Sequence, residues 1–474
     1  MTETNSKRVN WMPLAIGVYA LWVLLALGTD FSLYADGAHE FLRVLEAQTF
    51  VPLWWSRHFT YYTYQFPLVV AIKLGVTSLP WLRFALGLGC FLPWVSALLL
   101  CRWVSREHFW LAVVGCGAGY LNGAYMPVGQ HTVAHAEFWP ALFVLLFARP
   151  LKPGAILILL VMATGLQFSY ESQAFLSVPL LLLSVWRLSQ EKRAGSGLTR
   201  FVFLVAAALF LSSILNGTYS ILMSEAPANL NGFKSGTLKM LRQPGWTLTW
   251  TLLWGALAIA ACWSEKMWRT LTGKNGLYLG VATTLVWGFW PLLAPNQVDT
   301  GVQYDNRATN LLVPLALLPV GLVLSVRPAW LASRRERLVQ FAAVLLLAQS
   351  LWHCSNMFLW QRDVLAMKAA LGANRGVIPL RMTGLQAAGM LGRDLAPDAV
   401  SGRFEWAWPC LSIAITDKKE INSLICSEVV VNPYLRRYVW QPFDPFKPET
   451  FLKLNHYGIN CSNYVTALRE QLKN

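Results

Sequence analysis

The chain has 474 residues, of which 55% are hydrophobic and 13% are charged. Soluble globular domains carry about 25% charged residues, so this composition excludes an ordinary soluble enzyme and indicates a membrane protein. The formal charge of +15 does not indicate a nucleic-acid-binding protein, because the basic residues form short clusters between apolar runs and do not gather on one face or tail.

Apolar runs recur along the first three quarters of the chain, and each can cross the roughly 30 Å hydrocarbon layer as a helix. The first run follows Lys7 and Arg8, and no small-residue cleavage site comes after it. We therefore interpret it as a retained anchor and not as a signal peptide. We predict an all-α polytopic domain of about eleven transmembrane helices, at 11–29, 82–101, 108–125, 132–148, 154–170, 172–186, 201–216, 246–263, 277–294, 309–326 and 338–354.

Basic residues mark one side of this arrangement. Lys and Arg collect in loops that stay in the cytoplasm, and with eleven spans every strongly basic loop falls on the same side as the N-terminus. These loops carry Arg102 and Arg106, then Arg149 and Lys152, then Arg187 to Arg200, then Lys266 to Lys274, then Arg327 to Arg337. The pattern predicts a cytoplasmic N-terminus and a C-terminus on the other side. We expect the membrane to be a bacterial inner membrane.

The first outer loop, 30–81, contains an apolar segment at 66–75 that is too short to span. It follows an aromatic cluster of Trp54, Trp55, Tyr61, Tyr62 and Tyr64, so we expect an interfacial helix. The alternative is that this segment crosses the membrane. That would invert every later helix and place the basic clusters outside.

The composition changes near residue 356, and no later run reaches spanning length. We predict a membrane domain at 1–355 and a small α+β extracytoplasmic domain at 356–474. Strands are expected at 411–416 and 425–431, and a helix at 360–371. If this tail is extracytoplasmic, a disulfide between Cys410 and Cys426 is one alternative, with Cys461 left over, but spacing does not decide the pairing.

Candidate functional residues concentrate in the first outer loop. A helix that begins at Asp36 would place His39 or Glu40, and Arg43, on one face at three- to four-residue spacing. A carboxylate there can take a proton from an attacking hydroxyl or amine, while nearby cations neutralise a phosphate leaving group. Arg57 and His58 are the candidates for that phosphate, with membrane-surface anchoring as the alternative.

The order of these features resembles the polyprenyl-phosphate-sugar-dependent glycosyltransferases of the GT-C superfamily. The resemblance rests on Asp36-Gly-Ala-His-Glu-Phe-Leu-Arg43 after the first helix, an interfacial segment ending in Lys73-Leu74-Gly75, and Leu82-Arg83-Phe84 opening the next span. It covers about 30–106 in pattern and the whole chain in architecture. It implies that Asp36 is the catalytic base, with Asp30 as the competing acid, and that the C-terminal domain is soluble and extracytoplasmic.

Two departures from the family pattern affect what is expected of this site. Gly37 stands where the family often has a second acid, which puts a metal-dependent mechanism in doubt because one carboxylate fewer can hold a divalent cation. No metal ligand is assigned, and a divalent cation stays an open alternative. The usual His-Pro or Lys-Pro of the interfacial segment is also absent.

Outward-facing charges elsewhere supply the remaining candidates. Glu171, between two predicted spans, is a candidate acceptor group. Lys234, Lys239, Arg242 and Arg307 are further phosphate candidates, with contact to anionic lipid headgroups as the alternative. His131 and His135 share a helix face as metal ligands often do, but a polar rim on an outer cavity is the favoured interpretation of these residues and Glu137.

The resemblance therefore implies an inverting transfer of a sugar from a polyprenyl-phosphate donor to a glycan, lipid or protein acceptor. Membrane lipids are expected partners and nucleic acids are not. Two other classes stay open: a transporter or flippase of lipid-linked sugars, and a polysaccharide polymerase or ligase. The chain has no obvious inverted repeat, which disfavours the transporter.

Overall fold

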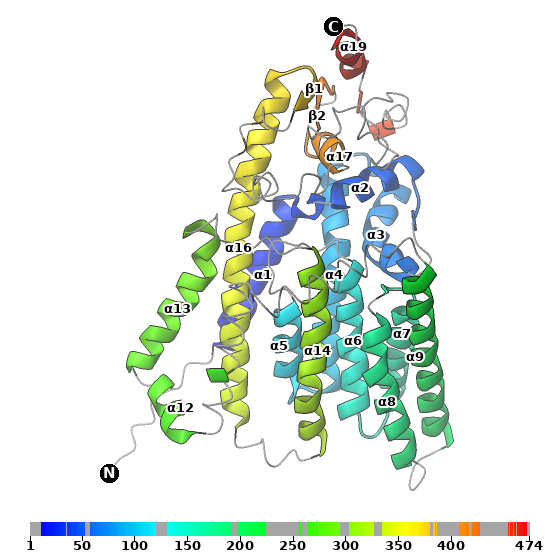
Figure 1. Cartoon of the computed structure of the whole chain (residues 1–474), viewed down its shortest axis with the longest axis vertical. Helices are drawn as coiled ribbons and strands as arrows, with labels where there is room; N and C mark the ends of the chain where they lie inside the picture. Colours follow the sequence, from blue (N-terminus) through cyan, green and yellow to red (C-terminus); the bar gives the residue numbers. More distant parts are fainter. Residues whose placement is uncertain are drawn as a thin grey trace.

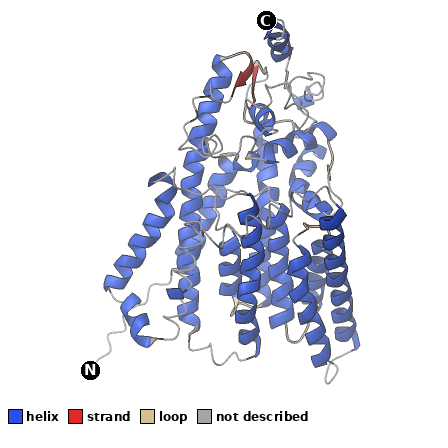
Figure 2. Ribbon diagram, in the orientation of Figure 1, coloured by secondary structure: helices blue, strands red, loops and turns tan. Residues whose placement is uncertain are grey.

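The computed structural model describes residues 11–34, 36–52, 57–119, 130–171, 173–191, 197–223, 264–272, 274–293, 303–326, 334–379, 407–416, 420–426 and 462–471, together with a few single positions between them. This part of the chain is mostly helical, as predicted, with one pair of short strands (Figure 2). Long helices lie side by side in a bundle, and the strands and the C-terminal helix lie at one end of it (Figure 1).

The bundle helices are apolar over most of their length, which explains both their formation and their packing. Proline stands in the first turn of α1, α4 and α7, where its missing N–H costs nothing. The bundle helices are α1 (Met12–Gly28), α4 (Leu79–Val104), α5 (Phe109–Gly119), α6 (Gln130–Phe147), α7 (Pro153–Leu166), α8 (Gln173–Glu191), α9 (Gly197–Met223), α13 (Lys274–Leu293), α14 (Gln303–Val326) and α16 (Arg335–Ala373).

Three helices of the described chain, α4, α9 and α16, are long and apolar enough to cross a membrane. Shorter apolar helices lie beside them, and large side chains such as Leu24, Leu182 and Leu215 are exposed on the outside of the bundle. Water would not favour so many exposed apolar side chains, so the structure is consistent with a membrane protein. Most of the predicted span at 246–263 lies outside the described residues.

Successive helices reverse direction, so the loops alternate between two ends of the bundle (Figure 1). The loops at the lower end carry the cations that the sequence predicted on one side. Contacts join these loops: the His108 ring stacks on Phe147 at 4.0 Å, and Arg337 pairs with Glu265 of α12 (Glu265–Thr272). The basic clusters of the described chain therefore share one end.

The opposite end carries the first-loop elements and the C-terminal elements (Figure 1). The first-loop elements are η1 (Phe31–Leu33), α2 (Asp36–Ala47) and α3 (His58–Lys73). The C-terminal elements are β1 (Gly376–Pro379), α17 (Ala407–Ala414), β2 (Ser423–Cys426) and α19 (Ser462–Gln471). The strands pair in parallel, from Gly376 with Ser423 to Pro379 with Cys426.

One sequence prediction for the C-terminal part is wrong, and one alternative that the sequence left open is not formed. The strand expected at 411–416 is helix α17 with its following turn, because its apolar side chains are buried on all sides and a short apolar run does not distinguish a strand from a buried helix. The disulfide between Cys410 and Cys426 is not formed, since Cys410 is a buried thiol. The strand predicted at 425–431 overlaps β2, and residues 427–431 lie outside the described part.

A single helix, α16, connects the bundle to the C-terminal elements. Its 39 residues cover both the last predicted span and the helix expected at 360–371, so residue 355, where the sequence suggests a domain boundary, lies inside it. The indole N–H of Trp360 donates to the Thr29 carbonyl at 2.8 Å, and its ring contacts Phe31 and Tyr34 edge-on. This packing fixes the chain just before α2.

Arg83 ties three separate parts of the chain together. Its guanidinium pairs with Asp30 at 3.1 Å and donates to the Ala414 carbonyl at 2.8 Å, and the side chain is only 4% exposed. Asp30 is therefore held in an ion pair at the end of α1, which favours a structural role for this competitor of Asp36. The same contacts fasten α17 to the bundle, and α17 in turn packs on α2.

The crossing of α3 and α4 requires glycine at position 89. A Cβ added there would lie 1.8 Å from the Tyr64 carbonyl oxygen, so the Gly89→Ala variant must separate the two helices. We expect it to lose about 1–3 kcal/mol of stability, measured as a lower midpoint of thermal unfolding in detergent. Gly17→Ala is the control, since a Cβ added at Gly17 meets no atom within 4 Å; equal effects of the two variants would contradict this assignment.

Candidate functional site

Helix α2 begins at Asp36, as predicted. The backbone of Asp36 is described and its side chain is not. The helix lies at the end of the bundle that carries the C-terminal elements, packed beneath α17 (Figure 1). An acidic residue in the first turn is favoured by the partial positive charge of a helix N-terminus. The fold therefore places the predicted catalytic residue at a helix start next to the C-terminal elements.

The other α2 candidates have different surroundings. Glu40 is buried and accepts a hydrogen bond from the Gln65 side chain at 3.2 Å, while Gln65 accepts from the Val51 backbone N–H at 2.9 Å. Glu40 therefore links α2 to α3. His39 and Arg43 lie one turn apart, and one terminal nitrogen of Arg43 is buried with no hydrogen-bond partner among the described residues.

Burial and, to a lesser extent, the nearby Arg43 charge lower the pKa of His39 from 6.5 to about 4. Above pH 6.5 the imidazole is neutral in both the folded and the unfolded chain. Below pH 6.5 the His39 imidazole is protonated in the unfolded chain but stays neutral in the folded chain. The free energy of unfolding therefore falls as the pH falls towards 4, by about 3 kcal/mol in total. We expect the midpoint of thermal unfolding to drop over this window in the wild type and to drop less in His39→Gln, which cannot take up this proton; equal drops would refute the assignment.

Arg57 and Glu171, which the sequence assigned to different roles, form an ion pair. The Nε of Arg57 donates to both carboxylate oxygens of Glu171, at 2.9 Å and 3.2 Å, and the side chains are 14% and 16% exposed. The guanidinium also lies over the Tyr170 ring, 4.8 Å from its centre. Burial lowers the pKa of Arg57, but Glu171 and the neighbouring tyrosines outweigh this and raise it overall, so the cation is held firmly.

Hydrogen bonds between α3 and the α7–α8 turn position this pair. The Phe59 backbone N–H donates to the Phe168 carbonyl at 2.9 Å, and the Thr60 hydroxyl donates to the Ser169 carbonyl at 2.6 Å. Within the turn, the Gln173 side chain accepts from the backbone N–H groups of Ser169 and Tyr170. The start of α3 and the turn that carries Glu171 therefore form one hydrogen-bonded unit.

The remaining candidates are described less completely. His58 begins α3, and its ring packs edge-on against Tyr62. Arg307 lies in α14 and His131 in α6, but their side chains lie outside the described part, as do Lys234, Lys239 and Arg242 entirely. His135 is fully buried against Trp94, and Glu137 contacts Ser169. No three His, Cys, Asp or Glu side chains of the described chain lie close enough to hold a metal ion.

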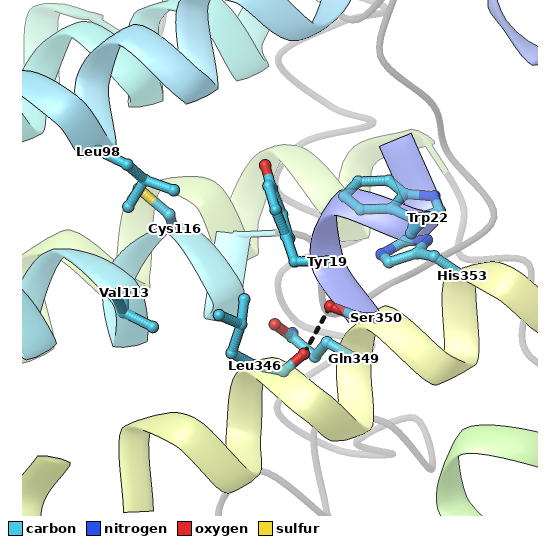
Figure 3. Close-up of a pocket in the computed structure, with 9 residues that line it drawn as sticks. All are labelled: Tyr19, Trp22, Leu98, Val113, Cys116, Leu346, Gln349, Ser350 and His353. Carbon is cyan, nitrogen blue, oxygen red and sulfur yellow. Dashed lines mark hydrogen bonds between the residues drawn. The ribbon is translucent and has the colours of Figure 1, made fainter. Parts of the chain in front are cut away.

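A buried polar stripe on α16 was missed by the sequence analysis. Gln349, His353, Asn356 and Asp363 are at most 5% exposed and recur every three to seven residues along the helix. This spacing, which begins in the last predicted span with Gln349 and His353, was the available signal. At its lower end, Gln349 and His353 line a small cavity between α1, α4, α5 and α16 (Figure 3). The cavity has room for about one water molecule, which is far too small for a lipid-linked sugar.

Comparison of the chain with models of known protein families, with curated proteins and with solved structures finds no match. The end of the bundle opposite the basic loops combines an acid at a helix start with a partly buried, oriented guanidinium and several tyrosines. Such a set can remove a proton from one group and bind an anion at another.

Proposed function

We propose that the protein is a membrane glycosyltransferase of the GT-C type, which moves a sugar from a polyprenyl-phosphate donor to an extracytoplasmic acceptor. In this proposal about eleven helices span a bacterial inner membrane. The N-terminus is cytoplasmic, and the first loop and the C-terminal part lie outside. The supporting observation is that α2, which starts at Asp36, and the Arg57–Glu171 pair lie at the same end of the bundle, away from the end that collects the basic loops.

The proposed reaction assigns one step to each group. Asp36 takes the proton from the acceptor hydroxyl or amine, which attacks the anomeric carbon of the sugar. The bond between that carbon and the phosphate oxygen breaks, and the electron pair leaves with the phosphate. Arg57 neutralises the negative charge on the leaving phosphate. Arg307, or Lys234, Lys239 and Arg242, would add further positive charge there. Attack opposite the leaving group inverts the anomeric centre.

Glu171 supports this assignment of Arg57. It engages the Nε of the guanidinium, which fixes the plane of the group, and the phosphate is then expected at the terminal nitrogens. A guanidinium binds a phosphate best through two parallel N–H donors in a fixed plane. Glu171 is therefore reassigned from an acceptor contact to a group that orients Arg57.

The proposal is tested by supplying purified protein in vesicles with radiolabelled polyprenyl-phosphate sugars and a lysate fraction of lipid and glycan acceptors. Transfer should produce a labelled acceptor and a free polyprenyl phosphate. A labelled lipid that changes leaflet with its sugar still attached would instead indicate a flippase. Mass spectrometry of the lipid that co-purifies with the protein would identify the carrier.

The topology has its own test. We expect a single cysteine placed at position 36 to react with a membrane-impermeant maleimide in intact cells with a permeabilised outer membrane. A cysteine at position 106, in the basic α4–α5 loop, should react only after the inner membrane is opened. The opposite result would remove the basis of the mechanism, because the carboxylate and the donor phosphate would be on the wrong side.

A further inference from the structure

Glu137 is a buried acid that the proposed reaction does not use. It lies in α6, is 5% exposed, and contacts the Ser169 hydroxyl oxygen through Oε2 at 2.5 Å. Its other oxygen, Oε1, has no hydrogen-bond partner in the described part of the chain. A Cβ added at Gly165 would lie 3.2 Å from Oε1 and 2.9 Å from the Phe59 ring, so Oε1 and this ring both lie beside Gly165.

The hydrogen bonds of the Ser169 hydroxyl require Glu137 to be protonated. The Ser169 hydroxyl oxygen lies 2.5 Å from Glu137 Oε2 and 2.8 Å from the Gly165 carbonyl oxygen. Each of these close oxygen pairs needs a proton between them, and a hydroxyl supplies one. The carbonyl cannot donate, so Ser169 donates to Gly165 and Glu137 must donate to Ser169. Glu137 is then a neutral carboxylic acid.

The surroundings of Glu137 agree with this assignment. An ionised carboxylate that is 5% exposed and has one oxygen without a hydrogen-bond partner among the described residues would be costly inside a membrane protein. A neutral acid instead leaves only a carbonyl oxygen unpaired, which costs much less.

Ser169 transmits this contact to the Arg57–Glu171 pair. Its carbonyl accepts from Thr60, three residues after Arg57, and its backbone lies two residues before Glu171. Fixing the Ser169 hydroxyl therefore fixes the turn on one side of the pair and the start of α3 on the other.

We infer that Glu137, as a neutral hydrogen-bond donor, is a positioning residue for the Arg57–Glu171 pair. This inference rests on the proposed function only in that it gives Arg57 a phosphate to bind. The protonation state and the effect on the pair are measurable without any substrate.

Infrared spectroscopy tests the protonation state. In a detergent without carbonyl groups, the wild type at neutral pH should show the carbonyl stretch of a protonated carboxylic acid, and Glu137→Gln should lose that band. Asp363→Asn, which changes another buried acid, is the matched control and should keep it. A spectrum of Glu137→Gln identical to the wild type in this region would overturn the inference.

Thermal unfolding tests the positioning. Glu137→Gln keeps a donor for Ser169 and should unfold at the wild-type midpoint, while Glu137→Met removes the donor and should unfold at a lower temperature. Arg57→Met should lower the unfolding midpoint less in the Glu137→Met background than in the wild type. The reason is that the Arg57–Glu171 pair is already misplaced in that background. Equal drops in the two backgrounds would overturn the positioning role.

Binding of farnesyl phosphate, with inorganic phosphate as a control, connects the residue to the proposed function. We expect Glu137→Gln to bind like the wild type and Glu137→Met to bind about fivefold to tenfold more weakly, the size of one lost hydrogen bond. If Glu137→Gln weakens binding as much as Glu137→Met, the neutral-donor assignment is wrong. If the wild type does not bind farnesyl phosphate, the phosphate site of the proposed function fails, while the infrared and unfolding results still decide the role of Glu137.

Discussion

Replacing Asp36 with Asn is expected to lower the rate of sugar transfer by about 10²–10⁴-fold, the range typical for loss of a general base. The amide cannot take the acceptor proton, but it fills almost the same space. Donor binding and the midpoint of thermal unfolding should therefore stay near the wild-type values. The measurement is transfer of radiolabelled sugar in vesicles, with unfolding followed in the same preparation.

The control for Asp36→Asn is Glu46→Gln, at the other end of the same helix, which should leave transfer unchanged. Asp36→Glu keeps the carboxylate but moves it along the side chain, and we expect intermediate activity. An Asp36→Asn protein that folds and transfers at the wild-type rate would exclude Asp36 as the base. A flippase would also show no dependence on this carboxylate, so the pair of variants separates the two functions.

The sequence predicted the elements that depend on local composition. Helix α1 matches the first predicted span within one residue at each end, and α2 begins at the predicted acid. These agreements have a common cause: an apolar run in lipid must satisfy its own backbone hydrogen bonds, and a helix is the simple way to do so. The gathering of the basic loops at one end follows from the same alternation of spans.

Contacts between distant segments could not be predicted in this way. Arg57 and Glu171 are 114 residues apart in the chain, and their pairing depends on how the α7–α8 turn packs on α3. The length of α16 was missed for a related reason. The sequence predicted separate helices at 338–354 and 360–371, and Trp360, near their junction, packs on the segment that leads into α2. Tertiary packing decided both features.

Removing the Arg57 charge is expected to lower both stability and ligand binding. Breaking a buried ion pair by deleting one partner costs about 3–5 kcal/mol. Because both side chains are slightly exposed, we expect Arg57→Met to cost about 2–3 kcal/mol, at or below the lower end of that range. The cost arises because Glu171 is left as an uncompensated charge, and it should appear as a lower midpoint of thermal unfolding.

The double variant Arg57→Met/Glu171→Met separates stability from function. It removes both charges, so most of the lost stability should return, as it does when apolar residues replace a whole buried pair. Binding of a polyprenyl monophosphate should not return, because the cation that holds the phosphate is still absent. Arg57→Lys should keep partial binding, since it retains the charge but not the planar fork. If the double variant recovers stability and also binds the lipid phosphate like the wild type, Arg57 serves only to hold α3 against the α7–α8 turn, and the phosphate must bind at the other outer cations.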